Sequence, residues 1–227
     1  MHIPLSSNAP LPLWEGDLEL PETPKSFRGE DGVRATIGSP EQWADGQLMG
    51  DKWHPPVGGR RYHVVRLAFT LRPRGRYTVV TEATFCLHLT AQGTQRAFIS
   101  DAFPRAQTVE LKDSVKFGLG PAFKIGTIEA ELASAEVTFD AGVVIPVVTV
   151  EGIQEPELCW RYRAHDKFPL TGSRIMHAIV SLPPETPRAL ATLSLSVVQQ
   201  DKLGPLPLGV PMNEQAKLQF AIGGRKS

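Results

Sequence analysis

The sequence predicts an all-β protein: an antiparallel β-sandwich of about eight to ten strands, with an irregular N-terminal arm that contains one short helix. From residue 62 onward, apolar and polar residues alternate with the period of two that is typical of half-buried strands. The chain also contains 20 glycines and 20 prolines, which divide the alternating part into short segments. A length of 227 residues is sufficient for one such domain.

Residues 1–60 are predicted to form the arm, and residues 61–227 the sandwich. The arm is rich in proline and glycine and holds three of the four tryptophans, Trp14, Trp43 and Trp53, which we expect to pin it to the body. The short helix is predicted to start at Ser39, because Pro40 suits the first helical position and Gln42 completes a capping box.

The first two long strands are predicted at 62–71 and 77–89, joined as a hairpin by the Pro-Arg-Gly turn at 73–75. In each strand the odd-numbered positions form a mostly apolar stripe, so one face of the hairpin should point into the core. A turn symmetric about residue 74 predicts the following opposite pairs: Phe69 with Val79, Val65 with Ala83, and Arg66 with Glu82.

Further strands are predicted along the rest of the chain. They are expected at 108–117, 122–132, 135–139, 143–150, 157–164, 174–182, 189–199 and 215–222. Pro146 predicts a bulge or an edge position within its strand, because proline cannot donate a ladder hydrogen bond. The Leu-Gly-Pro-Leu-Pro-Leu-Gly segment at 203–209 is predicted to be an extended connector lying on the sheet.

The charge of the chain is arranged in blocks although its formal net charge is zero. Residues 52–81 hold seven basic residues and no acid, and residues 125–160 hold seven acids and no base. The N-terminal residues 1–51 carry nine acids and three bases. Segregation of this kind can produce strong local fields if the fold keeps the blocks apart.

Cysteine content and hydropathy indicate the cellular location of the protein. Cys86 and Cys159 are the only cysteines and have no CxxC or metal-ligand spacing, so we expect two reduced, partly buried thiols. The first 13 residues lack the basic start and unbroken apolar stretch of a signal peptide. No stretch approaches the roughly 18 to 20 apolar residues of a membrane helix. We therefore predict a cytoplasmic protein with no membrane partner.

The sequence contains no recognisable catalytic or metal-binding motif, so we predict no catalytic residue, no metal and no cofactor. The sequence has no GxSxG motif, and the Gly-Leu-Gly-Pro stretch at 118–121 lacks the lysine and spacing of a phosphate loop. His165, Asp166 and His177 match no compact zinc spacing. The carboxylates of Glu129 and Glu131 are interpreted as a solvated strand face.

The basic and acidic blocks are the remaining candidates for a binding site. Arginine is favoured where flat, bidentate contacts to carboxylate or phosphate are made. The predicted partner-binding residues are Arg60, Arg61, Arg66, Arg72, Arg74 and Arg76 on the positive side, and Glu129, Glu131, Glu136 and Asp140 on the negative side. The predicted function is a non-enzymatic interaction or assembly module that binds another protein or another copy of itself.

Three alternatives stay open at this point. The two blocks can cancel each other within one copy. The arginines can bind nucleic acid or another polyanion, with a strong dependence on salt. A hydrolase with an unrecognised site is the third, and it requires several of five histidines to converge with an acid: His54, His63, His88, His165 and His177.

Overall fold

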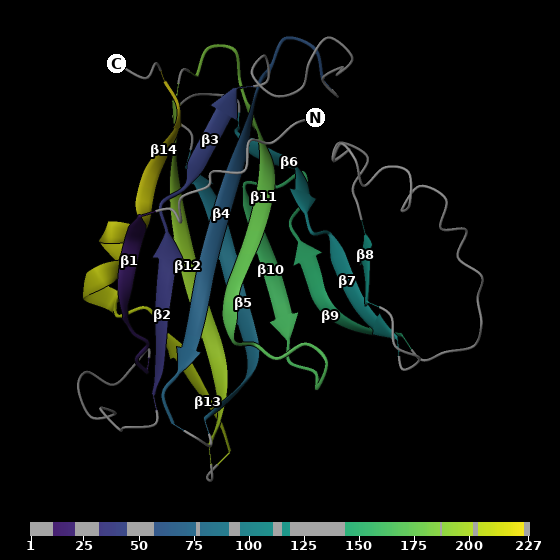
Figure 1. Cartoon of the computed structure of the whole chain (residues 1–227). Helices are drawn as coiled ribbons and strands as arrows, with labels where there is room; N and C mark the ends of the chain where they lie inside the picture. Colours follow the sequence, from purple (N-terminus) through teal and green to yellow (C-terminus); the bar gives the residue numbers. More distant parts are fainter. Residues whose placement is uncertain are drawn as a thin grey trace.

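The protein is a sandwich of two antiparallel sheets (Figure 1). The structure is a computed structural model, and it describes residues 11–20, 32–44, 57–75, 78–90, 96–110, 115–118, 144–186, 188–201 and 204–224. One sheet has six strands and the other has eight, so the described residues contain more strands than the eight to ten predicted from the sequence. The all-β class, the antiparallel sandwich and the presence of a short helix are confirmed.

We call the six-stranded sheet sheet A. Its order is β1 (Pro12–Asp17), β2 (Val33–Gly38), β4 (Arg61–Pro73), β11 (Gly172–Leu182) and β6 (Phe98–Phe103), and β3 (Glu41–Ala44) also pairs with β4. β2 pairs with the C-terminal half of β4 and β3 with its N-terminal half. β11 pairs along the opposite edge of β4, so β4 has neighbours along both of its edges.

Sheet B has eight strands. Its order is β13 (Gly204–Gly209), β12 (Arg188–Asp201), β5 (Val79–Thr90), β10 (Glu157–Arg163), β9 (Val144–Glu151), β7 (Ala106–Glu110) and β8 (Val115–Gly118), and β14 (Gln219–Gly223) pairs with β12. The 3₁₀ helix η2 (Met212–Leu218) precedes β14 and is drawn in yellow beside β1 in Figure 1.

The predicted hairpin between the first two long strands is wrong, although its two apolar stripes are right. β4 pairs with strands of sheet A and β5 with strands of sheet B, so the chain changes layers between them. The odd positions Val65, Phe69, Phe85 and Leu87 are all buried. Both stripes face one core from opposite sheets, an arrangement that has the same alternation as a hairpin.

The described part of the N-terminal arm is more regular than predicted. β1, β2 and β3 are hydrogen-bonded strands of sheet A. The predicted helix start lies at β3, and Gln42 bonds across to β14 through Ala221 O and Gly223 N, at 3.1 and 3.0 Å. These bonds compete with capping of a helix, and the short helix is instead η2. Trp14 is buried, as expected, and Trp53 lies outside the described residues.

Other strand predictions are refined by the structure. The register between β7 and β9 shifts opposite Pro146, which confirms the predicted bulge. The described part of the proline-rich segment, residues 204–209, is extended but forms β13 rather than a connector, because an edge strand tolerates proline on its outer side. The strand predicted at 215–222 is divided between the end of η2 and β14. The strands predicted at 122–132 and 135–139 lie outside the described residues.

An aromatic cluster joins the two sheets at the centre of the core. The ring of Phe69 from β4 stacks on Phe85 from β5 and meets Tyr162 from β10 edge to face, both at 5.4 Å between centroids. Trp160 is fully buried beside Phe85 and donates its indole N–H to Pro104 O at 3.2 Å. Burial of each such side chain contributes roughly 2 to 3 kcal/mol.

The layer assignment predicts energetic coupling between Phe69 and Phe85. Phe69→Ala and Phe85→Ala should each lower the free energy of unfolding by about 3 to 5 kcal/mol, measured by urea denaturation. The double variant should reveal a coupling of about 0.5 to 1.5 kcal/mol, because the rings stack.

The pair Phe69 and Val79, which a hairpin would place opposite each other, is the matched control. Their alanine variants should be additive to within about 0.5 kcal/mol, since Val79 lies on the other sheet and is half exposed. Coupling of Phe69 to Val79 in place of Phe85 would contradict the sandwich topology.

Candidate functional site

Three of the five described arginines in the basic block, Arg66, Arg72 and Arg74, are paired with acids of the N-terminal segment rather than with the acidic block at 125–160. Arg66 pairs with Glu41 at 3.0 Å, and Arg74 pairs with Asp17 at 2.8 Å. Arg72 lies 3.7 Å from Glu15. Charge cancellation within one copy therefore occurs for these arginines, but its partners come from residues 1–51.

Arg60 and Arg61 lie at the opposite end of β4 from Arg72. Arg60 donates to Ser181 Oγ at 2.6 Å and to Arg96 O at 2.7 Å, and its guanidinium stacks over Phe98. Arg61 donates to the backbone carbonyl of Thr186. Arg72 lies eleven residue steps along the strand from Arg61, which corresponds to about 36 Å. Within the part of the basic block that the structure describes, the arginines are thus spread along a strand and do not form one patch.

The remaining predicted contact residues are not tested. Arg76, Glu129, Glu131, Glu136 and Asp140 lie outside the described residues, so their part in binding stays a prediction.

Five charged side chains gather on the outer face of sheet A, and we call them the charge ladder. They are Glu15, Asp17, Arg34, Arg72 and Arg74. The register places Asp17, Arg34 and Arg72 side by side on three neighbouring strands. Each side chain of the ladder is between 37% and 53% exposed. The ladder is therefore a mixed-charge surface that is open to solvent.

Next to the ladder, the same face has a polar row and an exposed apolar residue. Thr36, Thr70 and Ser173 form the row, and the hydroxyls of Thr70 and Ser173 lie 2.8 Å apart. Ile175, two residues further along β11, is 46% exposed and opposite Ala68. Sequence reasoning missed this surface because the neighbours come from four separate strands.

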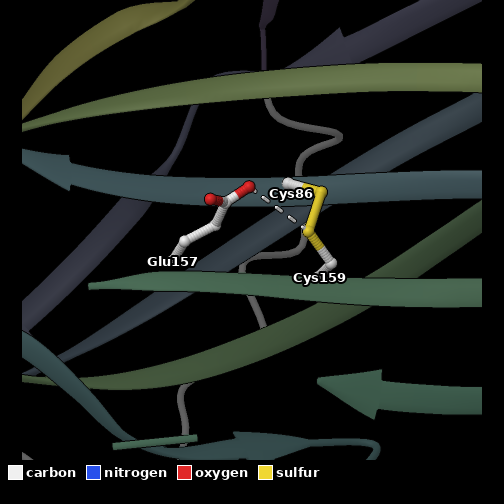
Figure 2. Close-up of side chains that lie close together, drawn as sticks. All are labelled: Cys86, Glu157 and Cys159. Atoms are coloured by element: carbon white, nitrogen blue, oxygen red, sulfur yellow. Dashed lines mark hydrogen bonds between the residues drawn. A yellow bond between two sulfur atoms is a disulfide. The ribbon is translucent and has the colours of Figure 1, made fainter. Parts of the chain in front are cut away.

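The outer face of sheet B carries a second cluster, and here the prediction of reduced cysteines is wrong. Cys86 on β5 and Cys159 on β10 form a disulfide between directly opposite residues, with their Cα atoms 4.1 Å apart. That distance is typical of the closer kind of antiparallel pair, which lacks backbone hydrogen bonds of its own. Glu157 Oε1 lies 3.7 Å from Cys159 Sγ (Figure 2).

One sequence signal was available for this pair. Both cysteines stand between two buried residues, in Phe85-Cys86-Leu87 and in Leu158-Cys159-Trp160, so both must point to the outer face. The signal does not say that the two strands are neighbours. That information comes from pairing across 73 residues.

The histidines that a hydrolase would need are distributed over different parts of the fold. His88 is on the outer face of sheet B, His177 belongs to β11 of sheet A, and His165 is in the turn after β10. His54 is outside the described residues. Among the described part of the chain, these three histidines do not share one site.

His177 is the histidine with the strongest environmental effect. Burial lowers its pKa to about 4, and the nearby positive charge of Arg66 acts in the same direction. Its ring lies 6.3 Å from that of Phe103. The side chain is consequently neutral near pH 7 and belongs to the packed part of sheet A.

No protein-family model matches the sequence, and no curated protein matches it. Across the described residues, no helix is long and apolar enough to cross a membrane.

The chain is remotely similar to several solved structures. A pore-forming protein has a TM-score of 0.37 and 6% identity, with 90% of this chain and 93% of that chain covered. The collagen-binding domain of a Staphylococcus aureus adhesin has a TM-score of 0.33 and 7% identity, with coverages of 81% and 94%. A structure of Gaeumannomyces graminis manganese lipoxygenase with part of Komagataella pastoris zonadhesin has a TM-score of 0.33 and 9% identity. This chain spans 46% of that last one and matches over 82% of its own length. No function is transferred from these similarities.

His177 should make the protein less stable in mild acid. The unfolded chain takes up its proton near pH 6.5, whereas the folded chain does so only near pH 4. The stabilisation is present above pH 6.5 and is lost as the pH falls toward 4, up to about 3 kcal/mol. Urea unfolding across this range should show the loss, and His177→Gln should flatten it. The same substitution at exposed His88 is the control, and an unchanged profile for His177→Gln would contradict the assignment.

The disulfide should contribute directly to stability. Closing a loop of 73 residues restricts the unfolded chain, so reduction should lower the free energy of unfolding by up to about 4 kcal/mol. Thermal denaturation of the oxidised chain and of the Cys86→Ser, Cys159→Ser double variant measures this difference. Equal stability of the two would contradict a net contribution of the cross-link to folding.

Proposed function

We propose that the protein is a non-enzymatic interaction module that associates with a second copy through the outer face of sheet A. The contact surface consists of the charge ladder with Ile175 and its polar row. The single observation that supports this proposal is the ladder, since guanidinium and carboxylate groups stand together on it in an exposed and self-complementary arrangement.

A two-fold axis suits a surface that carries both signs. In an isologous dimer, a residue of one copy contacts a different residue of the other, and the reverse contact occurs as well. Arg72 of one copy would then face Glu15 and Asp17 of the second. The same relation repeats on the other side of the axis, so each such contact is made twice.

The existing ion pairs of the ladder are easily rearranged. Exposed salt bridges are worth about 0 to 1 kcal/mol, because both partners remain hydrated. A second copy can therefore exchange internal partners for intermolecular ones at small cost. Ile175, exposed at 46%, supplies apolar area beside the charged groups. Arginine around an apolar centre is typical of protein interfaces.

The described sheet edges favour a face over an edge as the contact. The loop before β10 bonds to β6, with Gln154 N donating to Ile99 O and Ile99 N donating to Glu155 O, at 2.8 and 2.9 Å. β13 carries Pro205 and Pro207, which lack N–H donors. Covered and proline-bearing edges resist the addition of another strand.

Polyanion binding is the principal competitor. A phosphate chain would have to displace Glu15 and Asp17 from the same guanidinium groups, and these carboxylates would repel it.

We further propose that the protein is cytoplasmic, a compartment in which thiol reductants act on accessible disulfides.

Charge exchange provides the test. Sedimentation velocity at low salt should show a dimer, and high salt should shift it toward monomer. Arg72→Glu should weaken dimerisation at least about tenfold, and so should the Glu15→Arg, Asp17→Arg double variant. An equimolar mixture of the two variants should restore the dimer, because opposite charges face each other again at both contacts.

Arg163→Glu is the matched control, since Arg163 is an exposed arginine paired with Glu82 on sheet B. It should leave the dimer unchanged, and circular dichroism should show native β content for every variant. A wild-type chain that stays monomeric at low salt overturns the proposal. Binding of heparin by that monomer, lost in Arg72→Glu, would favour a polyanion as the ligand.

A further inference from the structure

The outer face of sheet B holds four potential metal ligands on two successive rungs of the β5–β10 ladder. The first rung is Cys86 opposite Cys159, and the second is His88 opposite Glu157. The sulfur atoms and a carboxylate oxygen of Glu157 all lie within 4.8 Å of one another. Both cysteines are half-buried, and both second-rung residues are exposed. Solvent ions therefore have access to the cluster.

Glu157 already turns toward the sulfur atoms of the first rung (Figure 2). Its carboxylate contacts Cys159 Sγ at 3.7 Å, across a spacing of two residues along β10. His88 stands at the same spacing from Cys86 along β5 and on the same face. Rotation of its side chain would bring the imidazole toward the sulfur atoms from the neighbouring strand.

The sheet holds these residues from both sides. β5 is paired with β12 and β10 with β9, so Cys86 has Ser194 as its other neighbour and Cys159 has Glu151. Glu151 is paired with Arg161 at 3.0 Å. Gly152 follows with a φ of +91°, and a Cβ there would lie 1.9 Å from Glu157 O. The tight β9–β10 turn thus fixes the position of Glu157 at the start of β10.

We propose that the reduced chain binds one thiophilic divalent cation, Zn²⁺ being the probe, through Cys86, Cys159, His88 and Glu157, and that the disulfide and the metal exclude each other. Two thiolates, an imidazole and a carboxylate complete a tetrahedral set, and thiolates select zinc over magnesium or calcium. With Zn–S bonds of about 2.3 Å, the sulfur atoms of such a site stand roughly 3.8 Å apart. That separation needs rotation of the two side chains and no break in the ladder.

The disulfide form and the zinc-bound form interconvert through the two free thiols. An external dithiol gives two electrons and two protons to the Cys86–Cys159 bond, which opens to two thiols, and the dithiol becomes a disulfide. Zn²⁺ then displaces the two thiol protons, which pass to solvent. In the reverse direction, a small-molecule disulfide takes two electrons from the thiolates and two protons from solvent and becomes two thiols, while the Cys86–Cys159 bond forms again and the cation leaves.

This inference is independent of the proposed self-association, because the two sites lie on opposite sheets. The test uses the full chain, oxidised or reduced with a phosphine that is removed before titration. Isothermal titration with Zn²⁺ at neutral pH should give one equivalent for the reduced chain and none for the oxidised chain. Co²⁺ in place of Zn²⁺ should add a thiolate charge-transfer band and the visible bands of a tetrahedral site.

Single variants separate a four-ligand site from a simple dithiol. His88→Ala and Glu157→Gln should each lower zinc affinity at least about tenfold, while Cys86→Ser should abolish binding. Thr90→Ala and Glu82→Gln are matched controls on the outer face of β5 and should bind as the wild type does. Uptake by the oxidised chain, or affinity indifferent to both His88 and Glu157, overturns the proposal. Circular dichroism accompanies each titration, and loss of the sheet on reduction would also overturn it.

Discussion

The packing of β4 against β5 across the core is the interaction on which the rest of the structure depends. These two long strands follow one another in the sequence but belong to different sheets, and Phe69 and Phe85 stack where they cross. Each strand then serves as a central template. β4 collects β2, β3 and β11, while β5 collects β12 and β10. The charge ladder and the cysteine pair are both consequences of these pairings.

Backbone hydrogen bonds between the sheets support this packing along their edges. Glu19, just beyond β1, exchanges two bonds with Gly209 of β13, at 2.8 and 2.7 Å. On the far side, the turn at residues 152–156 bonds to β6. Gln42 makes a similar link between β3 and β14 with its side-chain amide. The chain therefore satisfies much of its exposed strand edge internally, and its two outer faces remain as broad accessible surfaces.

Period-two alternation determined from the sequence which residues point inward, but it does not identify the strand partner. Phe69 and Phe85 were correctly assigned to the core, whereas Arg66 was assigned to Glu82 and is bonded to Glu41 instead. A hairpin and a pair of facing strands have the same alternation, so only the long-range pairings separate them. The same limit applies to the cysteines, whose outward direction is legible in the sequence and whose proximity is not.

The partners of the arginines show why charge blocks along a chain are a poor guide to charged patches on a fold. A strand of 13 residues carries the ends of its block far apart, as it does Arg61 and Arg72 in β4. Antiparallel pairing then brings in residues from a different block, here Asp17 of β1 and Glu41 of β3. Cross-strand pairs determine which charged side chains gather on the surface, because directly opposite residues of neighbouring strands place their side chains in one row. The ladder of sheet A and the two rungs of cysteine, histidine and glutamate on sheet B are both of this kind. Chemistry on this fold is therefore best sought by following rungs across the outer faces, where packing places no demand on the choice of side chain.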